Sequence, residues 1–205
     1  AAGLRTGFLS WHSLRVRTVT LWLVRHAQPL IQEGLCYGQL DIPADPLATQ
    51  QAAQAVAPLL PAGATLYCSG LLRAQQLAQA IQQQRNTFSL NIDLRLNEIN
   101  FGVWEGVAWD QIPKAAFDRW MQDFDHHRFG GAECLRDLLT RVHQALLALS
   151  TREDAIWVTH AGVIRAVNYL QQYGLQPLAT AATWPAEAPA FGGWQCLELG
   201  QAEAG

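Results

Sequence analysis

Three short apolar segments, separated by helical patterns, constrain the fold of this chain most strongly. The runs are VTLWLV at 19–24, ATLYCS at 64–69 and DAIWVTH at 154–160, and most of their residues are apolar or β-branched. Such runs are typical of strands that are buried on both faces of a parallel sheet. A parallel pair needs a crossover connection, and the sequence supplies a helical pattern between successive runs.

Apolar residues at helical spacing fill much of the remaining chain. We expect helices at 46–60, 71–84, 132–149 and 161–174, and an edge strand at 194–199. This alternation predicts an α/β protein with three layers, in which a largely parallel, doubly wound sheet is covered by helices on both faces.

The length of 205 residues fits one domain. We expect this domain to span residues 19–199, with a helical excursion at 103–129, a segment rich in Trp and Asp. Residues 1–18 contain three arginines and no acidic residue, and we expect them to be a disordered extension. Residues 200–205 are expected to be a disordered tail.

Composition excludes several classes of partner. The net charge is −3 and Lys114 is the only lysine, so no basic face indicates a nucleic-acid or anionic-membrane partner. No apolar run approaches the roughly 20 residues that span a bilayer. The four cysteines lie far apart without a C-x-x-C pair, which indicates neither a zinc site nor a disulfide framework. We therefore expect a soluble, cytoplasmic protein, and the sequence leaves a homodimer open.

Basic side chains stand where the predicted strands end. Arg25 and His26 follow the first strand, Arg73 lies in the first turn of the helix after the second strand, and His160 ends the third. In doubly wound sheets, ligands bind outside the carboxyl ends of the strands. Two arginines and two histidines are thus expected to share one crevice.

This set of side chains suits the transfer of a phosphoryl group. A phosphate monoester is a dianion, and arginine binds it through charge-assisted hydrogen bonds worth about 1.5–3 kcal/mol each. A neutral imidazole can attack phosphorus, and a second, protonated imidazole can stabilise the oxygens of the transition state. We assign these roles to His26 and His160, with Arg25 and Arg73 as phosphate ligands.

The departing alkoxide needs a proton from a carboxylic acid. Glu98, in RLNEINFGVWEG, is the preferred donor. Glu105, seven positions away in the same segment, is the rival donor, and Asp93 is a weaker one.

Some conspicuous residues have a plain structural explanation. His126 and His127 are adjacent, so on a helix they point about 100° apart, and without a third ligand we interpret them as a solvated pair. The sequence leaves open whether Trp104, Trp109 and Trp120 line a substrate pocket or pack within the excursion.

Four motifs, in order along the chain, together resemble the histidine phosphatase superfamily, which has the phosphoglycerate mutase-like fold. They are LVRHA at 23–27, SGLLRAQQLA at 69–78, LNEINFGVWEG at 96–106 and VTHAG at 158–162. The resemblance implies His26 as nucleophile, Glu98 as proton donor, and Arg25, Arg73 and His160 as the phosphate pocket. It also implies that neither metal nor cofactor takes part.

The segments GLCYGQLDIP at 34–43 and FGVWEG look most like the α-ribazole phosphatase branch, whose members act in cobalamin biosynthesis. This resemblance implies a metal-independent phosphomonoesterase acting on a small organic phosphate through a phosphohistidine, with α-ribazole 5'-phosphate as a candidate. The alternatives are a phosphoglycerate mutase-type phosphoryl transferase and a non-catalytic phospho-ligand binding protein. Ala27, Gln28 and Pro29 depart from the common family pattern, which leaves substrate selection by the loop at 28–39 open.

Overall fold

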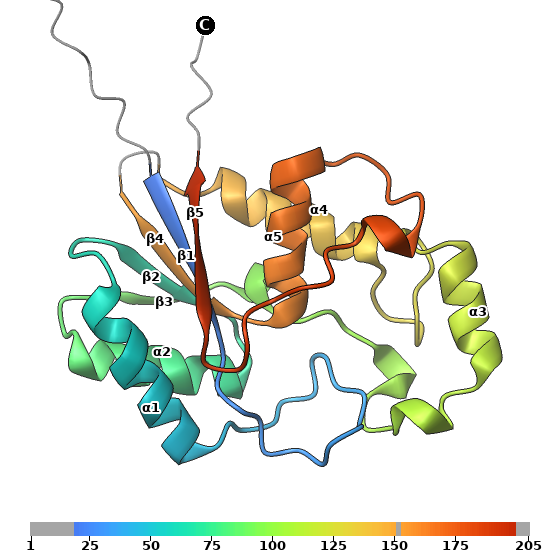
Figure 1. Cartoon of the computed structure of the whole chain (residues 1–205), viewed down its shortest axis with the longest axis horizontal. Coiled ribbons are helices and arrows are strands. Elements are labelled where there is room, and N and C mark those ends of the chain that lie inside the picture. The colour runs from blue at the N-terminus through green and yellow to red at the C-terminus, as the bar shows by residue number, and fades with distance from the viewer. Residues whose placement is uncertain (1–18, 151–152, 200–205) are drawn as a thin grey trace, which may run out of the picture.

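A five-stranded sheet forms the centre of the molecule in the computed structural model, which describes residues 19–150 and 153–199 (Figure 1). The strand order is β3-β2-β4-β1-β5. The bounds are β1 Val19–Arg25, β2 Thr65–Cys68, β3 Leu90–Ile92, β4 Ala155–Thr159 and β5 Trp194–Leu199. All pairings are parallel except that of β5 with β1, which is antiparallel at the sheet edge. The predicted α/β class with a largely parallel sheet is confirmed.

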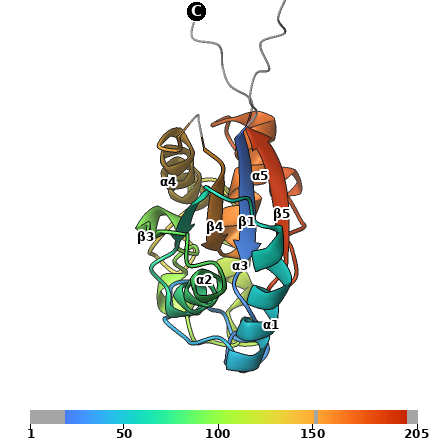
Figure 2. The ribbon, with the colours of Figure 1, turned by 90° about the vertical axis from the view of Figure 1, so that its left-hand side faces the viewer.

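Helices cover both faces of this sheet. Their bounds are α1 Pro46–Val56, α2 Leu72–Gln84, α3 Lys114–Gln122, α4 Leu135–Leu147 and α5 Ala161–Tyr173. α1 and α2 share one hydrophobic core with the sheet, and α4 and α5 share another. β1 and β4 run side by side with their carboxyl ends directed toward the same edge of the molecule (Figure 2).

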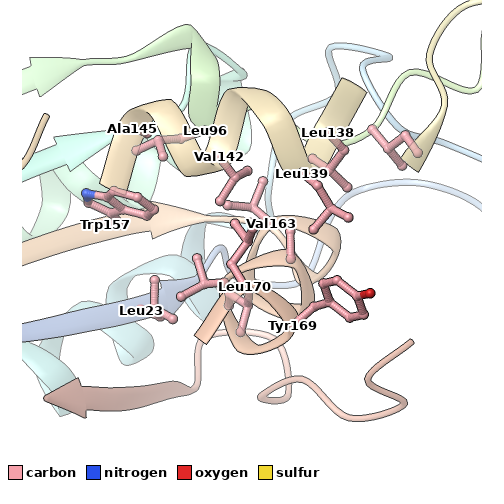
Figure 3. Close-up of a cluster of buried hydrophobic side chains, with 14 of the residues drawn as sticks. Leu23, Leu96, Leu138, Leu139, Val142, Ala145, Trp157, Val163, Tyr169 and Leu170 are labelled. Carbon is pink, nitrogen blue, oxygen red and sulfur yellow. The ribbon is translucent and has the colours of Figure 1, made fainter. Parts of the chain in front are cut away.

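Alternation along the buried strands divides the core into its two halves. Leu23 and Trp157 point to the side of α4 and α5, where Figure 3 shows them near Val163 and Leu170. Their neighbours in the sequence belong to the core on the side of α1 and α2. Truncating such a fully buried side chain costs about 2–5 kcal/mol of stability, so both faces hold the strand ends in place.

Two element boundaries differ from expectation for local reasons. α1 ends at Val56 and continues as a single 3-10 turn to Leu59, because Pro58 has no N–H for the helical ladder. α4 begins at Leu135 rather than at residue 132. The Asp137 carboxylate caps this start by accepting a hydrogen bond from the amide of the N-cap residue Cys134.

β3 was not expected from the sequence. It has three residues, lies at the sheet edge beside β2, and two of its three residues are exposed. A strand of three residues is too short for alternation of apolar and polar residues to identify it.

The segment 103–129 contains α3 and the 3-10 turn Trp109–Gln111. It has a small core of its own, in which Phe129 is buried and the ring of Trp120 stacks on it at a centroid distance of 4.5 Å. Within the described residues, no helix is long and apolar enough to cross a membrane. The expected extension at 1–18 and tail at 200–205 lie outside the described residues.

Candidate active site

His26 follows β1 directly and is 2% exposed. Its amide donates to the Thr159 carbonyl, which ties the end of β1 to the end of β4. Its Nδ1 lies 2.7 Å from the carbonyl oxygen of Ala27. A carbonyl only accepts hydrogen bonds, so Nδ1 carries the hydrogen and Nε2 keeps a free lone pair.

The charge state of His26 also follows from its surroundings. Burial, aided by the positive charge of Arg73, lowers the pKa of His26 to about 3. The imidazole is therefore neutral near pH 7. A neutral ring with a free Nε2 is the form that can attack an electrophile.

His160 lies beside His26 at the N-terminus of α5, with ring centroids 5.0 Å apart. It is fully buried, and its Nε2 is 2.7 Å from the Ser69 hydroxyl oxygen. When that hydroxyl donates to Nε2, the hydrogen of the neutral ring sits on Nδ1. Burial, followed by the charges of His26 and Arg73, holds the pKa of His160 well below its usual value. The His160 imidazole is therefore neutral without a bound anion, in contrast to the protonated state that we expected. A bound dianion would favour the protonated imidazole.

Arg73 is a fully buried residue in the first turn of α2. Its Nη1 donates to the Leu40 carbonyl at 2.9 Å, and its Nη2 donates to the Gly38 carbonyl at 2.6 Å. The sequence predicted that Arg73 is a phosphate ligand. In the structure it also fixes the loop around residues 38–40.

Arg25 is half-buried at the end of β1. Its Nη1 donates to the Pro189 carbonyl at 2.9 Å, and its guanidinium lies 3.9 Å from the centroid of the Phe191 ring. Burial lowers the pKa of Arg25, while the nearby Tyr37 and Glu98 side chains raise it. Because arginine starts from a pKa above 12, it stays charged at neutral pH.

Three buried nitrogen atoms of this group lack a hydrogen-bond partner. They are Nε of Arg25, Nε of Arg73 and Nδ1 of His160. Among the described residues, the only other buried side-chain polar atoms without a partner are Oδ1 of Asp125 and Nε of Arg165. An unpaired buried donor costs about 1–3 kcal/mol. An anion held among these side chains could accept from all three, which makes the cluster suited to a phosphoryl group.

Glu98 lies against the start of α5. Its Oε2 accepts from the Gly162 amide at 3.1 Å and its Oε1 accepts from the Ile99 amide at 3.0 Å. A Cβ atom at Gly162 would overlap the carboxylate, so only glycine leaves room for it. The Glu98 charge also acts on both Arg25 and Arg73, which places this carboxylate at the edge of the arginine cluster.

An ion pair behind Glu98 holds its segment in place. Nη1 of Arg141, on α4, donates to the carbonyl oxygens of Arg95 at 2.7 Å and of Asn97 at 2.6 Å. Its Nη2 donates to the Glu98 carbonyl at 3.2 Å, and its Nε donates to the Glu133 carboxylate at 2.6 Å. The Arg141 guanidinium thus fixes the backbone that carries Glu98.

Glu105, the rival proton donor, has a different environment. Its Oε1 accepts from the amides of Gln39 and Phe101, both at 2.9 Å, and its Oε2 accepts from the Leu40 amide. These three amides bind both oxygens of the carboxylate. Two of them, those of Gln39 and Leu40, belong to the loop that Arg73 also holds. The arrangement favours Glu105 as an anchor of the loop rather than as a donor to substrate.

The weaker candidate, Asp93, caps a 3-10 turn and forms an ion pair with Arg95 at 2.6 Å. The exposed His126 lies 3.7 Å from Asp123, which is an ordinary surface contact. The described residues contain no group of three or more His, Cys, Asp or Glu that could hold a metal ion.

A cavity of about 390 Å³ adjoins the cluster. It lies between the loop that follows β1 and the segment before β5, and it is lined by Gln28, Pro29, Ile31, Gln32, Glu33, Gly34, Leu35, Tyr37 and Phe191. None of the three tryptophans of the excursion belongs to this lining, because they pack around Phe129 instead.

Sequence reasoning missed several contributors. Ser69 orients His160, Phe191 covers Arg25, and Arg141 holds the segment of Glu98. The signal for Ser69 and Gly162 was present, since both lie inside the motifs SGLLRAQQLA and VTHAG. Phe191 and Arg141 lie outside every motif, and only the folded chain brings them to the site.

Comparison with known proteins places this geometry in a family. Residues 21–183 match the histidine phosphatase superfamily (branch 1). The chain belongs to this superfamily. The expectation of a histidine phosphatase is thereby confirmed at the level of the family.

Curated relatives of this histidine phosphatase include two eukaryotic proteins. It is 29% identical over 109 residues to a Caenorhabditis elegans 6-phosphofructo-2-kinase/fructose-2,6-bisphosphatase, covering 51% of this chain and 23% of that protein. It is 26% identical over 177 residues to a probable fructose-2,6-bisphosphatase of Schizosaccharomyces pombe, covering 81% of this chain and 41% of that one. The chain spans less than half the length of these relatives.

Solved structures share the fold along most of the chain. The mycobacterial glucosyl-3-phosphoglycerate phosphatase Rv2419c aligns with a TM-score of 0.71 at 24% identity, covering 88% of this chain and 90% of that one. The Thermus thermophilus protein TTHB049 aligns with a TM-score of 0.65 at 29% identity, covering 87% and 93%. The fold is thus the phosphoglycerate mutase-like fold of these structures, and none of these likenesses assigns the α-ribazole phosphatase branch.

Proposed function

We propose that this protein is a metal-independent phosphomonoesterase that hydrolyses a small organic phosphate through a phosphohistidine at His26. The observation that carries the proposal is a neutral, buried His26 whose Nδ1 is bound to the Ala27 carbonyl, next to three buried nitrogen atoms that have no hydrogen-bond partner. Two guanidinium groups supply the positive charge that a metal ion would otherwise supply. The pocket is thus built for a dianion and a nucleophile together.

The first half of the reaction forms the phosphoenzyme. Nε2 of His26 attacks phosphorus, a P–N bond forms, and the bond between phosphorus and the alcohol oxygen breaks. Arg25, Arg73 and His160 hold the three remaining phosphoryl oxygens. The alcohol oxygen takes a proton from Glu98 as it leaves.

The second half returns the free enzyme. The Glu98 carboxylate accepts a proton from a water molecule, whose oxygen attacks phosphorus as the P–N bond breaks. Inorganic phosphate leaves, and His26 regains its lone pair on Nε2. Glu98 therefore serves as acid in one half and as base in the other.

The proposal includes α-ribazole 5'-phosphate as the first substrate to test, because GLCYGQLDIP and FGVWEG resemble that branch. Cobalamin biosynthesis would then be the process served. The names of the relatives suggest other esters, fructose 2,6-bisphosphate and glucosyl 3-phosphoglycerate. A cytoplasmic location also belongs to the proposal, supported by four cysteines that are all free.

Trapping the phosphoenzyme tests the mechanism. Glu98→Gln should slow phosphorylation of His26 by an alkyl phosphate about 10²–10⁴-fold, and phosphorylation by p-nitrophenyl phosphate, followed as a burst of p-nitrophenolate, far less, because p-nitrophenolate hardly needs a proton. With the aryl ester, this variant should accumulate acid-labile phosphate on the peptide that contains His26, detected by mass spectrometry.

The matched controls are two histidine variants. His26→Ala should abolish both activities, whereas His126→Ala removes an exposed imidazole and should leave both unchanged. Retained turnover in His26→Ala would disprove the proposal. If Glu98→Gln slows phosphorylation of His26 by both esters by the same factor, Glu98 is not the donor.

A further inference from the structure

The 390 Å³ cavity begins where the phosphoryl cluster ends. Phe191 belongs to its lining, and the same ring lies 5.4 Å from the His26 ring and 3.9 Å from the Arg25 guanidinium. Tyr37, on the opposite loop, also lines the cavity and has the Arg73 guanidinium 5.4 Å from its ring centroid. An ester held at His26 therefore has this cavity beside it for its alcohol part.

The lining is both polar and apolar, and it contains no cation. Amides come from Gln28 and Gln32, a carboxylate from the exposed Glu33, and a hydroxyl from Tyr37, while the other lining residues are apolar or glycine. None of the nine lining residues, all within the described part of the chain, is Lys, Arg or His. The nearest cations are Arg25 and Arg73, whose guanidinium groups lie 3.9 Å and 5.4 Å from the Phe191 and Tyr37 rings. Their two positive charges are already matched by the two negative charges of one bound phosphoryl group.

A second anionic group in this cavity would be poorly compensated. A carboxylate or second phosphate loses part of its hydration on entering, and no side chain of the lining itself supplies a positive charge to replace it. It would also meet the negative charge of Glu33. A hydroxyl or a heterocyclic nitrogen, in contrast, finds amide and hydroxyl partners, with apolar surfaces for the rest of the molecule.

We infer that this enzyme selects monophosphates whose alcohol part is neutral or cationic, and that it discriminates against esters carrying a carboxylate or a second phosphate. The inference rests on the proposed phosphatase function and narrows its substrate class. It predicts that bisphosphates and phosphoglycerates are poor substrates of this enzyme.

A matched pair of substrates tests it. Glycerol 3-phosphate and 3-phosphoglycerate differ only in that a carboxylate replaces a hydroxymethyl group. Glycerol 3-phosphate should have the higher kcat/KM by about tenfold or more, because the carboxylate meets no paired donor. The p-nitrophenyl ester, measured beside them, reports whether phosphoryl transfer itself works.

Charge reversal at Glu33 adds a second readout. Replacing a negative by a positive charge about 10 Å from the carboxylate in water should shift the ratio of the two kcat/KM values about fourfold toward 3-phosphoglycerate. The shift should shrink as salt is added. The control is Glu198→Lys, the same charge change at an exposed position on β5, near the start of β1, and it should leave the ratio unchanged.

The outcomes separate the two proposals. If the p-nitrophenyl ester is hydrolysed but 3-phosphoglycerate is turned over as well as glycerol 3-phosphate, the inference is wrong while the phosphatase function stands. If Glu33→Lys moves the ratio no more than Glu198→Lys, the inference is also wrong. If the aryl ester is not hydrolysed, the proposed function fails. Calorimetry with the wild-type protein then tests the selectivity: glycerol 3-phosphate should bind more tightly than 3-phosphoglycerate, and equal binding of the two esters would disprove the inference.

Discussion

Gly162→Ala isolates the contact between α5 and the catalytic carboxylate. The new Cβ would overlap Oε1 of Glu98 and lie 3.1 Å from its carboxyl carbon. To restore ordinary van der Waals contact, the carboxylate must move by about 1 Å. Such a move breaks the bond from the Gly162 amide, now 3.1 Å, or the bond from the Ile99 amide, now 3.0 Å.

The expected loss lies in catalysis and not in folding. A displacement of about 1 Å of a catalytic group costs about 100-fold, so kcat for an alkyl phosphate should fall by about this factor. Gly162 is the second residue of α5, where alanine is the better helix former by up to about 1 kcal/mol, so the free energy of unfolding should not fall. The burst of p-nitrophenolate from p-nitrophenyl phosphate, which reports phosphorylation of His26 alone, should change by less than about threefold, since this leaving group needs little protonation.

A double-mutant cycle provides the assay that decides. Phosphorylation rates and steady-state rates with both esters are measured for Gly162→Ala, Glu98→Gln and the double variant, and thermal unfolding is followed for each. If the glycine acts through the carboxylate, the double variant is no slower than Glu98→Gln alone. Additive losses, or an equal loss with the aryl and alkyl esters, would refute this reasoning.

Three further predictions follow from other contacts. Glu105→Gln should lower the unfolding temperature and slow hydrolysis of aryl and alkyl esters alike, because the Glu105 carboxylate binds three backbone amides. If only hydrolysis of the alkyl ester slowed, Glu105 would be the proton donor instead. His26 has a folded pKa of about 3, below its unfolded value near 6.5, so protonation favours the unfolded state. The contribution of neutral His26 to the free energy of unfolding is present above about pH 6.5 and is lost toward pH 3, by up to about 1.4 kcal/mol per pH unit. The free energy of unfolding in urea should therefore depend less on pH in His26→Gln than in the wild type. An equal pH dependence of the two proteins would contradict this. EDTA should leave hydrolysis of p-nitrophenyl phosphate unchanged, and a loss restored by one divalent metal would contradict the metal-independent mechanism.

Local patterns in the sequence were sufficient to predict the strands β1, β2, β4 and β5 and the order of the helices between them. Buried parallel strands are continuous apolar runs, and such runs identify themselves without knowledge of their neighbours. The two catalytic histidine candidates could be named for the same reason, because each directly follows such a run. Strand β3 was not predicted, since three residues, two of them exposed, are too few to form a recognisable pattern and pair only because β2 is already there.

The different surroundings of the two glutamates were decided by tertiary structure. Glu98 and Glu105 stand in one motif, and as side chains they have the same chemistry. Each carboxylate accepts from one amide nearby in the sequence, Ile99 for Glu98 and Phe101 for Glu105. What separates them is the distant partners, the Gly162 amide at the start of α5 for Glu98 and the amides of Gln39 and Leu40 for Glu105, which no local pattern encodes.

The same reasoning applies to the cavity and the residues that hold the site. The sequence by itself determined that an α/β sheet would gather two arginines and two histidines at its strand ends, because strand direction alone dictates that. Only the folded chain decided that Phe191 would cover Arg25, that Arg141 would hold the segment of Glu98, and that the cavity beside them would contain no cation. Loop conformation and long-range packing set these contacts, and neither leaves a periodic signal in the sequence.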